Sequence, residues 1–193
     1  MFFFPTIPIL MALTEPDSDL LEQSIAEVAT GDVTALETLY REAKSAVYGF
    51  ALSYLKNAHD AEDVLHDTFV SVWSAAAGYQ AQGKPMAWLL TITKNLCLDR
   101  LRRQTKQAEL PDEERSDLFA EREDLSQEDK WLLQQTLQGL SEEERQIIML
   151  HAVGGLKHRE IAAMLDLVLP TVLSKYRRGL KKLKETYEKE GLL

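Results

Sequence analysis

Apolar residues recur every three to four positions along most of the chain, which is the spacing of amphipathic helices. Within 18–105 this pattern predicts several helices, and the last of them runs from Pro85, where a proline suits the first turn, to about Arg103. Asp60 is the expected N-cap of the helix before it, which ends near Ala76. No stretch of useful length alternates apolar and polar residues as a strand does. The pattern therefore predicts an all-α protein.

The helical pattern is interrupted by an acidic strip over 107–129. Ten acidic and two basic residues fall in these 23 positions, so the strip carries −8 of the chain's net charge of −9. Few large apolar residues accompany them, and such a segment cannot bury enough surface to offset the entropy lost on ordering. We therefore expect two small helical domains, at 18–105 and 130–193, joined by an acidic flexible linker at 106–129.

Residues 1–17 are expected to form a disordered tail. Their apolar run is broken by Pro5 and Pro8, is shorter than the about 20 residues that span a bilayer, and has no basic residue before Arg41 as a secretory signal would require. We hypothesise that translation starts at Met11, where the globular pattern begins. A single cysteine, Cys97, excludes a disulfide framework and a Cys-based zinc site. We expect a cytoplasmic protein without direct membrane insertion.

The C-terminal part of the chain has the pattern of a helix-turn-helix. Ser141 and Glu144 form a capping box that opens one helix. A short helix at 158–165, a turn at 166–169 and a long helix from Pro170 follow it. The apolar residues expected on the inner face of this motif are Ile161, Ala162, Leu165, Val172, Tyr176, Leu180 and Leu183.

The long helix is strongly basic, with six Lys or Arg and no acid between Thr171 and Lys184. A recognition helix in the major groove meets base edges with its N-terminal residues and phosphates with cations at its sides. A solvated basic face would show the same charge, but Gly154-Gly155-Leu156 and Glu160-Ile161-Ala162 before the helix favour DNA binding. The candidate DNA-binding residues are Pro170, Thr171, Leu173, Ser174, Lys175, Arg177 and Arg178.

A second basic cluster ends the helix that starts at Pro85. It combines cations with aromatic, hydroxyl and amide side chains, which suits the capture of single-stranded DNA by phosphate attraction, stacking and hydrogen bonds to base edges. Trp88 also fits an apolar stripe, so a place in the core is the alternative for this residue. The candidate residues are Lys84, Trp88, Thr91, Lys94, Asn95, Arg102 and Arg103.

An acidic face lies on the preceding helix, where Asp60, Asp63 and Asp67 share one side with Glu62 beside them. Three interpretations stay open: docking of a basic partner, a solvated face, or a divalent-metal site, which usually needs oxygens from more than one element. The chain has no glycine-rich phosphate loop, no nucleophile elbow and no histidines at metal-ligand spacing. Neither an enzymatic activity nor a cofactor is expected.

Two ordered sets of residues point to a known family. In the first domain they are Leu39-Tyr40-Arg41, Asp60-Ala61-Glu62-Asp63-Val64, Ala87-Trp88-Leu89-Leu90-Thr91-Ile92 and Asp99-Arg100-Leu101-Arg102-Arg103. In the second they are Leu140-Ser141-Glu142-Glu143-Glu144-Arg145, Gly155-Leu156, Glu160-Ile161-Ala162 and Thr171-Val172. The chain thus resembles bacterial RNA polymerase sigma factors of the extracytoplasmic-function (ECF) type, with sigma domain two over 18–103 and sigma domain four over 130–187.

The resemblance implies a subunit that binds core RNA polymerase and directs it to promoter DNA. The first domain would read and open the −10 element, the helix-turn-helix would read the −35 element, and an anti-sigma factor would be a further partner. When extended, the linker spans up to about 80 Å, which is enough for the roughly 70 Å of two turns of DNA. The residues that would dock on the clamp helices of the largest polymerase subunit are Asp60, Glu62, Asp63, His66 and Asp67.

The recognition helix departs from the family pattern. Val168 replaces the usual Ser N-cap, Pro170 replaces a Gly, and Leu173 replaces a Lys and favours contact with a thymine methyl group. The −35 sequence that this chain reads therefore does not follow from the resemblance. The alternatives are a stand-alone helix-turn-helix regulator, which would bind duplex DNA tightly by itself, and a metal-dependent nucleic-acid enzyme that uses the three aspartates.

Overall fold

The computed structural model describes residues 17–81, 83–108 and 139–190, and the secondary structure within these ranges is helical, as the all-α prediction expects. The helices before the acidic strip are α2 (Ser18–Ala29), α3 (Val33–Leu55), α4 (Ala58–Ala75), the 3-10 turn η1 (Ala76–Gly78) and α5 (Pro85–Ala108). Those after it are α7 (Glu142–Ala152), α8 (His158–Met164) and α9 (Leu169–Glu190). Residues 1–16 of the predicted tail and residues 109–129 of the acidic strip lie outside the described residues.

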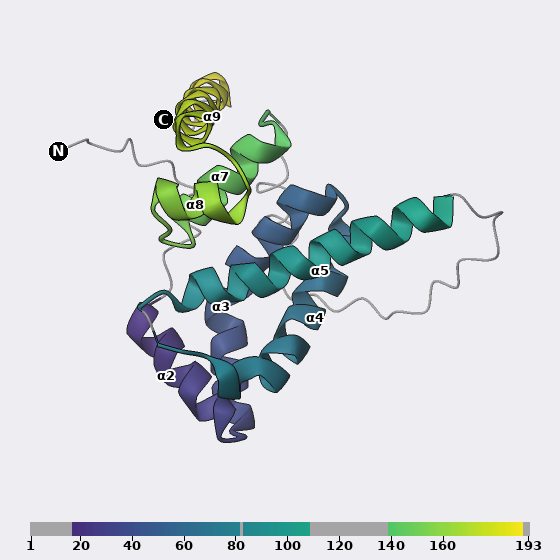
Figure 1. Cartoon of the computed structure of the whole chain (residues 1–193), viewed down its shortest axis with the longest axis vertical. Helices are drawn as coiled ribbons and strands as arrows, with labels where there is room; N and C mark the ends of the chain where they lie inside the picture. The colour runs from purple at the N-terminus through teal and green to yellow at the C-terminus, as the bar shows by residue number, and fades with distance from the viewer. Residues whose placement is uncertain (1–16, 82, 109–138, 191–193) are drawn as a thin grey trace.

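The long helix α5 crosses α3 and α4, and α7, α8 and α9 lie together at one end of the molecule (Figure 1). No helix in the described part of the chain is long and apolar enough to cross a membrane. α5 continues to Ala108, so residues 106–108, which the sequence assigns to the linker, belong to this helix.

Short polar side chains set the starts of the helices. Asp32 caps α3, and Ser141 and Glu144 form the predicted capping box of α7. At α4 the cap is Asn57, whose side-chain oxygen accepts a hydrogen bond from the Asp60 N–H at 3.0 Å. The prediction that Asp60 is the N-cap is therefore wrong: Asp60 lies in the first turn, and its carboxylate is used elsewhere.

The second half of α3 is the centre of the molecule. Every residue from Ala46 to Leu55 is buried, and α2, α4, α5 and α7 all pack against this helix. A helix with one core-facing side shows a single apolar stripe. Burial on all sides explains why small and apolar residues fill this half of α3 without such a stripe.

The helices on the two sides of the acidic strip share one hydrophobic core. α7 packs against α3, and the buried cluster extends from Leu21 in α2 to Leu183 in α9. Gly154, which follows α7, lies so close to α5 that a Cβ atom on it would meet Leu90 Cδ1 at 3.2 Å. Lys56 and Glu142 add an exposed ion pair of 3.6 Å between the two parts. Neither composition nor periodicity predicts this docking.

Cys97 is enclosed in this core. Burial raises the pKa of its thiol to about 12, and the thiolate is the reactive form. We therefore expect the native protein to resist labelling by iodoacetamide at neutral pH, and the urea-unfolded protein to take up one label, as measured by intact mass. Rapid labelling of the native protein at Cys97 would contradict this placement.

Candidate nucleic-acid interface

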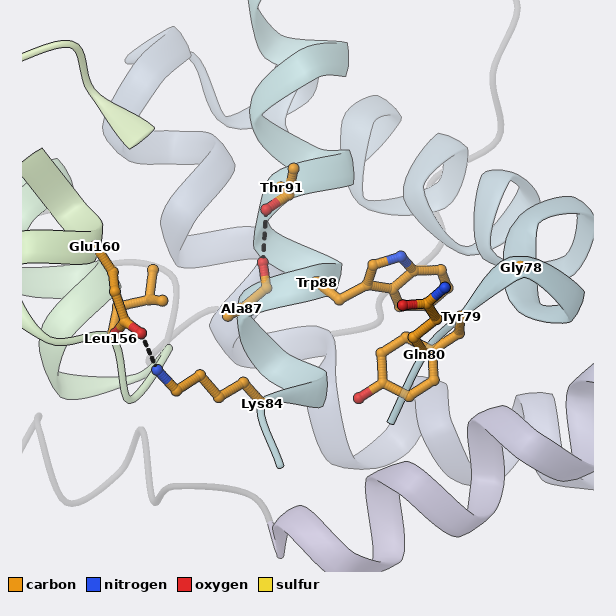
Figure 2. Close-up of a pocket in the computed structure, with 9 residues that line it drawn as sticks. All are labelled: Gly78, Tyr79, Gln80, Lys84, Ala87, Trp88, Thr91, Leu156 and Glu160. Atoms are coloured by element: carbon orange, nitrogen blue, oxygen red, sulfur yellow. Dashed lines mark hydrogen bonds and ion pairs between the residues drawn. The ribbon is translucent and has the colours of Figure 1, made fainter. Parts of the chain in front are cut away.

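An aromatic pocket lies beside the start of α5. The rings of Tyr79 and Trp88 have centroids 4.9 Å apart and are tilted by 52°, and the Tyr79 hydroxyl donates to Glu22 Oε1 at 3.0 Å, which fixes that ring. The cavity has a volume of about 430 Å³, and Leu156 and Glu160 line its opposite side. Figure 2 shows Trp88 and Tyr79 together on one side and the side chain of Lys84, the residue before α5, reaching toward Glu160.

Three of the seven residues predicted for single-strand capture line this pocket: Lys84, Trp88 and Thr91. Trp88 is half-buried and packs against the core while it lines the cavity, so both interpretations of this residue apply. Asn95, Arg102 and Arg103 are exposed further along α5, and Arg102 pairs with Asp99 at 3.0 Å. α5 thus brings together an aromatic pocket and a cationic end.

Two lysines are held by α8: Lys84, the residue before α5, and Lys94 within α5. Lys84 Nζ pairs with the Glu160 carboxylate, and Lys94 Nζ donates to the Met164 carbonyl oxygen. The hydrogen bonds from Lys84 and from the Lys157 N–H lower the pKa of the Glu160 carboxyl. We call this contact between α8 and α5 the closed arrangement. In it, Lys84 and Lys94 are occupied by the protein itself.

Asp60 and Asp63, predicted as docking residues, are bound within the protein. Arg100 Nη2 donates to Asp60 Oδ1 at 2.6 Å and to Asp63 Oδ2 at 2.7 Å, and Gln104 Nε2 donates to Asp60 Oδ2 at 2.8 Å. Burial alone would lower the pKa of the Arg100 guanidinium, but its hydrogen bonds to the two aspartates outweigh burial and raise it. These two carboxylates therefore join α4 to α5.

The outward side of α4 carries the rest of the predicted docking set. Asp67 is exposed, and Glu62 and His66 are half-buried. Two apolar neighbours that the predicted docking residues do not include, Val70 and Trp73, are 68% and 40% exposed on the same side. Their positions opposite the buried stripe of α4 could have revealed them. We call these five residues the outer face of α4; exposed apolar side chains beside an acid are typical of an interaction surface.

No three His, Cys, Asp or Glu side chains within the described ranges gather as metal ligands. Two of the three aspartates of α4 are instead neutralised by Arg100. Outside α4, His151 and His158, which are seven residues apart in the chain, have ring centroids 4.3 Å apart. Burial and the neighbouring His151 lower the pKa of His158, and both rings pack against Tyr176.

α8 and α9 form the predicted helix-turn-helix. Between them, Asp166 adopts the left-handed conformation with φ 54°, a conformation that glycine adopts most readily. The predicted inner face is confirmed, with Ile161, Ala162, Val172 and Leu183 buried and Leu165, Tyr176 and Leu180 packed against the core.

The cations of α9 fall into two groups. Lys175 pairs with Glu143 of α7, and Lys182 Nζ lies 2.7 Å from Glu144 Oε2. Both therefore hold α9 on α7. The exposed side of α9 carries Pro170, Ser174, Arg177, Arg178 and Lys181, while Thr171 and Leu173 are half-exposed. Four of the seven predicted recognition residues thus lie at least partly open in the first two turns, and Arg177 and Arg178 follow them.

A helix-turn-helix beside a second basic, aromatic surface defines a DNA-binding protein. Family models for Sigma-70 region 2 and Sigma-70 region 4 match residues 39–107 and 130–183. The ECF RNA polymerase sigma factor SigE of Mycolicibacterium smegmatis is 35% identical over 201 residues, which cover 95% of this chain and 78% of SigE. SigK of Mycobacterium sp. (strain KMS) is 29% identical over 187 residues, or 93% of this chain and 95% of SigK.

Two solved structures share the fold. CnrH in complex with the cytosolic domain of CnrY is 25% identical, with a TM-score of 0.54 over 89% of this chain and 98% of CnrH. RpoE of Bartonella quintana, solved with the anti-sigma factor NepR, is 23% identical, with a TM-score of 0.54 over 76% of this chain and 92% of RpoE. The chain belongs to the ECF RNA polymerase sigma factors. This family consists of transcription initiation factors and is not a known enzyme family, so the sigma-factor hypothesis is confirmed over the stand-alone regulator.

Proposed function

We propose that this sigma factor uses three surfaces in transcription initiation. The outer face of α4 binds core RNA polymerase. The aromatic pocket and the exposed side of α5 hold the unpaired strand of the −10 element. The exposed side of α9 reads the −35 element. The protein acts in the cytoplasm, where the polymerase and the promoter are found.

The observation that carries the −10 assignment is the pair of rings beside cationic side chains. Stacking of a base on an aromatic ring contributes about 1–3 kcal/mol and tolerates every base. Trp88 and Tyr79 supply such rings at the wall of a cavity with room for a base, and Thr91 adds a hydroxyl. Asn95, Arg102 and Arg103 extend the surface along α5 with an amide and two cations.

The closed arrangement must open before the two promoter elements are bound together. Two turns of DNA separate them by roughly 70 Å, whereas Lys84 and Glu160 are in direct contact. Lys84 and Lys94 become available to phosphates only when α8 leaves α5. Binding of the outer face of α4 and of the helix-turn-helix to separate sites on the polymerase would supply the free energy for this opening.

An anti-sigma factor is a proposed second partner, since the related fold of RpoE was solved with one. A partner that binds both the helices before the acidic strip and those after it would stabilise the closed arrangement and keep Lys84 and Lys94 occupied. Affinity purification of the tagged chain from its own host, followed by mass spectrometry, tests this. Recovery of polymerase subunits alone would contradict it.

Transcription reconstituted from core RNA polymerase, the full chain and a promoter selected by the resulting holoenzyme tests the proposed function as a whole. We expect specific transcripts only when the chain is present. The variant Trp88→Ala should reduce promoter opening, measured by permanganate reactivity of unpaired thymines, and leave binding to core polymerase unchanged. Equal opening by this variant would contradict the role of the pocket.

The outer face of α4 can be tested separately. Trp73→Ala should weaken the affinity for core polymerase at least tenfold, or about 1.4 kcal/mol, because exposed Trp residues often dominate interfaces. Val33, which is 68% exposed at the start of α3, provides the matched control Val33→Ala, with no expected effect. Arg100→Ala should instead lower the melting temperature, because Asp60 and Asp63 lose their partner. Fluorescence anisotropy and thermal unfolding measure the two effects; an unchanged affinity in Trp73→Ala would contradict the assignment.

A further inference from the structure

The first turn of α9 carries three apolar residues and one hydroxyl, that of Thr171, where a recognition helix is expected to be polar. Val168, immediately before the helix, is 67% exposed. Pro170 is exposed, and Leu173 is half-exposed and is not among the described side chains that pack against the core. The first charged residue of the helix is Lys175, and its ammonium is held by Glu143. The leading end of α9 therefore presents hydrocarbon to the solvent.

The backbone at this end also has few free donors. Pro170 has no N–H, and the N–H groups of Thr171 and Val172 both donate to the Val168 carbonyl oxygen, at 3.0 and 3.2 Å. Helix N-termini usually bind anions through such groups. Few backbone N–H groups at this end of α9 are therefore left to donate to acceptors on base edges. The Val168 side chain has no polar atom with which to cap the helix.

The major groove has one apolar group on its base edges, the C5-methyl of thymine. The N-terminal residues of a recognition helix are those that meet base edges. We propose that Val168 and Leu173 contact thymine methyl groups in the −35 element, so that this sigma factor selects thymine at those positions by apolar contact. This inference rests on the proposed role of α9 at the −35 element.

The inference can be tested at single methyl groups with the holoenzyme. Promoters are first selected from duplexes randomised in two blocks placed two helical turns apart. Each thymine in the selected −35 block is then replaced, one at a time, by deoxyuridine, which lacks only the methyl group. We expect at least one replacement to weaken holoenzyme binding about fourfold, the ratio that corresponds to the burial of one methyl group.

Two variants assign the contact to residues. Val168→Ser removes the hydrocarbon and supplies a preferred N-cap, so loss of folding is not expected; it should abolish the difference between thymine and deoxyuridine at one position. Leu173→Lys should do the same at another position. The matched control is Val33→Ser, which changes an equally exposed valine on α3 and should retain the difference.

The inference is overturned if no deoxyuridine weakens binding, if the selected −35 block contains no thymine, or if both variants retain the full difference. Failure of the proposed function gives another result, since no promoter would then be selected and no template would be transcribed. The inference fails alone if transcripts form equally well from the thymine and deoxyuridine templates.

Discussion

A tether between positions 84 and 160 is expected to abolish promoter-dependent transcription. Lys84 and Glu160 are in contact in the closed arrangement, and a short cleavable bismaleimide between Lys84→Cys and Glu160→Cys would hold α8 on α5. The −35 contacts are then lost, and at about 1–3 kcal/mol per base pair the loss of two base pairs reduces promoter affinity about a hundredfold. Run-off transcription from the selected promoter measures the effect.

Three controls isolate the tether from the substitutions. Cleavage of the bismaleimide leaves the same double variant with two separate maleimide adducts. This cleaved protein should regain activity. A second tether between Gln23→Cys and Glu27→Cys, whose native side chains lie 2.9 Å apart on α2, should leave transcription unchanged. Cys97 is buried and should not react. Full activity of the closed, tethered protein would contradict the requirement for opening.

Removal of the Glu144 carboxylate is expected to have the largest effect on stability. Its side chain is 4% exposed, accepts from the Ser141 N–H at 2.9 Å and pairs with Lys182 at 2.7 Å. Loss of the capping box lowers the free energy of unfolding by about 1 kcal/mol, and loss of a charged hydrogen bond lowers it by about 2 kcal/mol. Glu144→Ala should therefore lower the free energy of unfolding by about 3 kcal/mol, measured by urea denaturation followed by circular dichroism.

The neighbouring acid provides the matched control, because Glu143 is more exposed and, among the described residues, forms an ion pair with Lys175 alone. Glu143→Ala should lower the free energy of unfolding by less than about 1 kcal/mol. Equal effects of the two variants would contradict the role of Glu144.

The contribution of Glu144 should depend on pH in a defined direction. Burial alone would raise the pKa of its carboxyl, but the hydrogen bonds from Lys182 and Ser141 outweigh burial and lower it below the ordinary value of 4.5. A depressed pKa in the folded state gives stability that is present above the unfolded pKa and is lost as pH falls through the folded one. The difference in unfolding free energy between wild type and Glu144→Gln should shrink toward low pH.

The local features of the fold could be predicted from the sequence, because they depend on neighbours in the chain. The capping box at Ser141 and the inner face of the helix-turn-helix follow from spacing alone. The N-cap of α4 does not follow from the sequence, because Asn57 and Asp60 are both good capping residues and only the backbone geometry distinguishes them.

The candidate surfaces could be predicted only in part, because charge in a sequence does not show its partner. Asp60 and Asp63 share a helix face with Asp67, yet Arg100 binds the first two and leaves the third exposed. Lys175 likewise pairs with Glu143, so the prediction that it contacts −35 DNA requires this ion pair to open. Such contacts link residues far apart in the chain, as does the docking of α7 on α3.

Burial of the second half of α3 on all sides has a consequence for the lifetime of the protein in the cell. Tyr54 lies where α3 meets α7: burial raises the pKa of its hydroxyl, with smaller contributions from Cys97 and from Glu142 of α7. When α7 departs, this apolar side of α3 meets water unless another protein covers it. We therefore expect molecules that open without polymerase to be the ones that proteases degrade, so that the supply of core enzyme sets how long this factor persists.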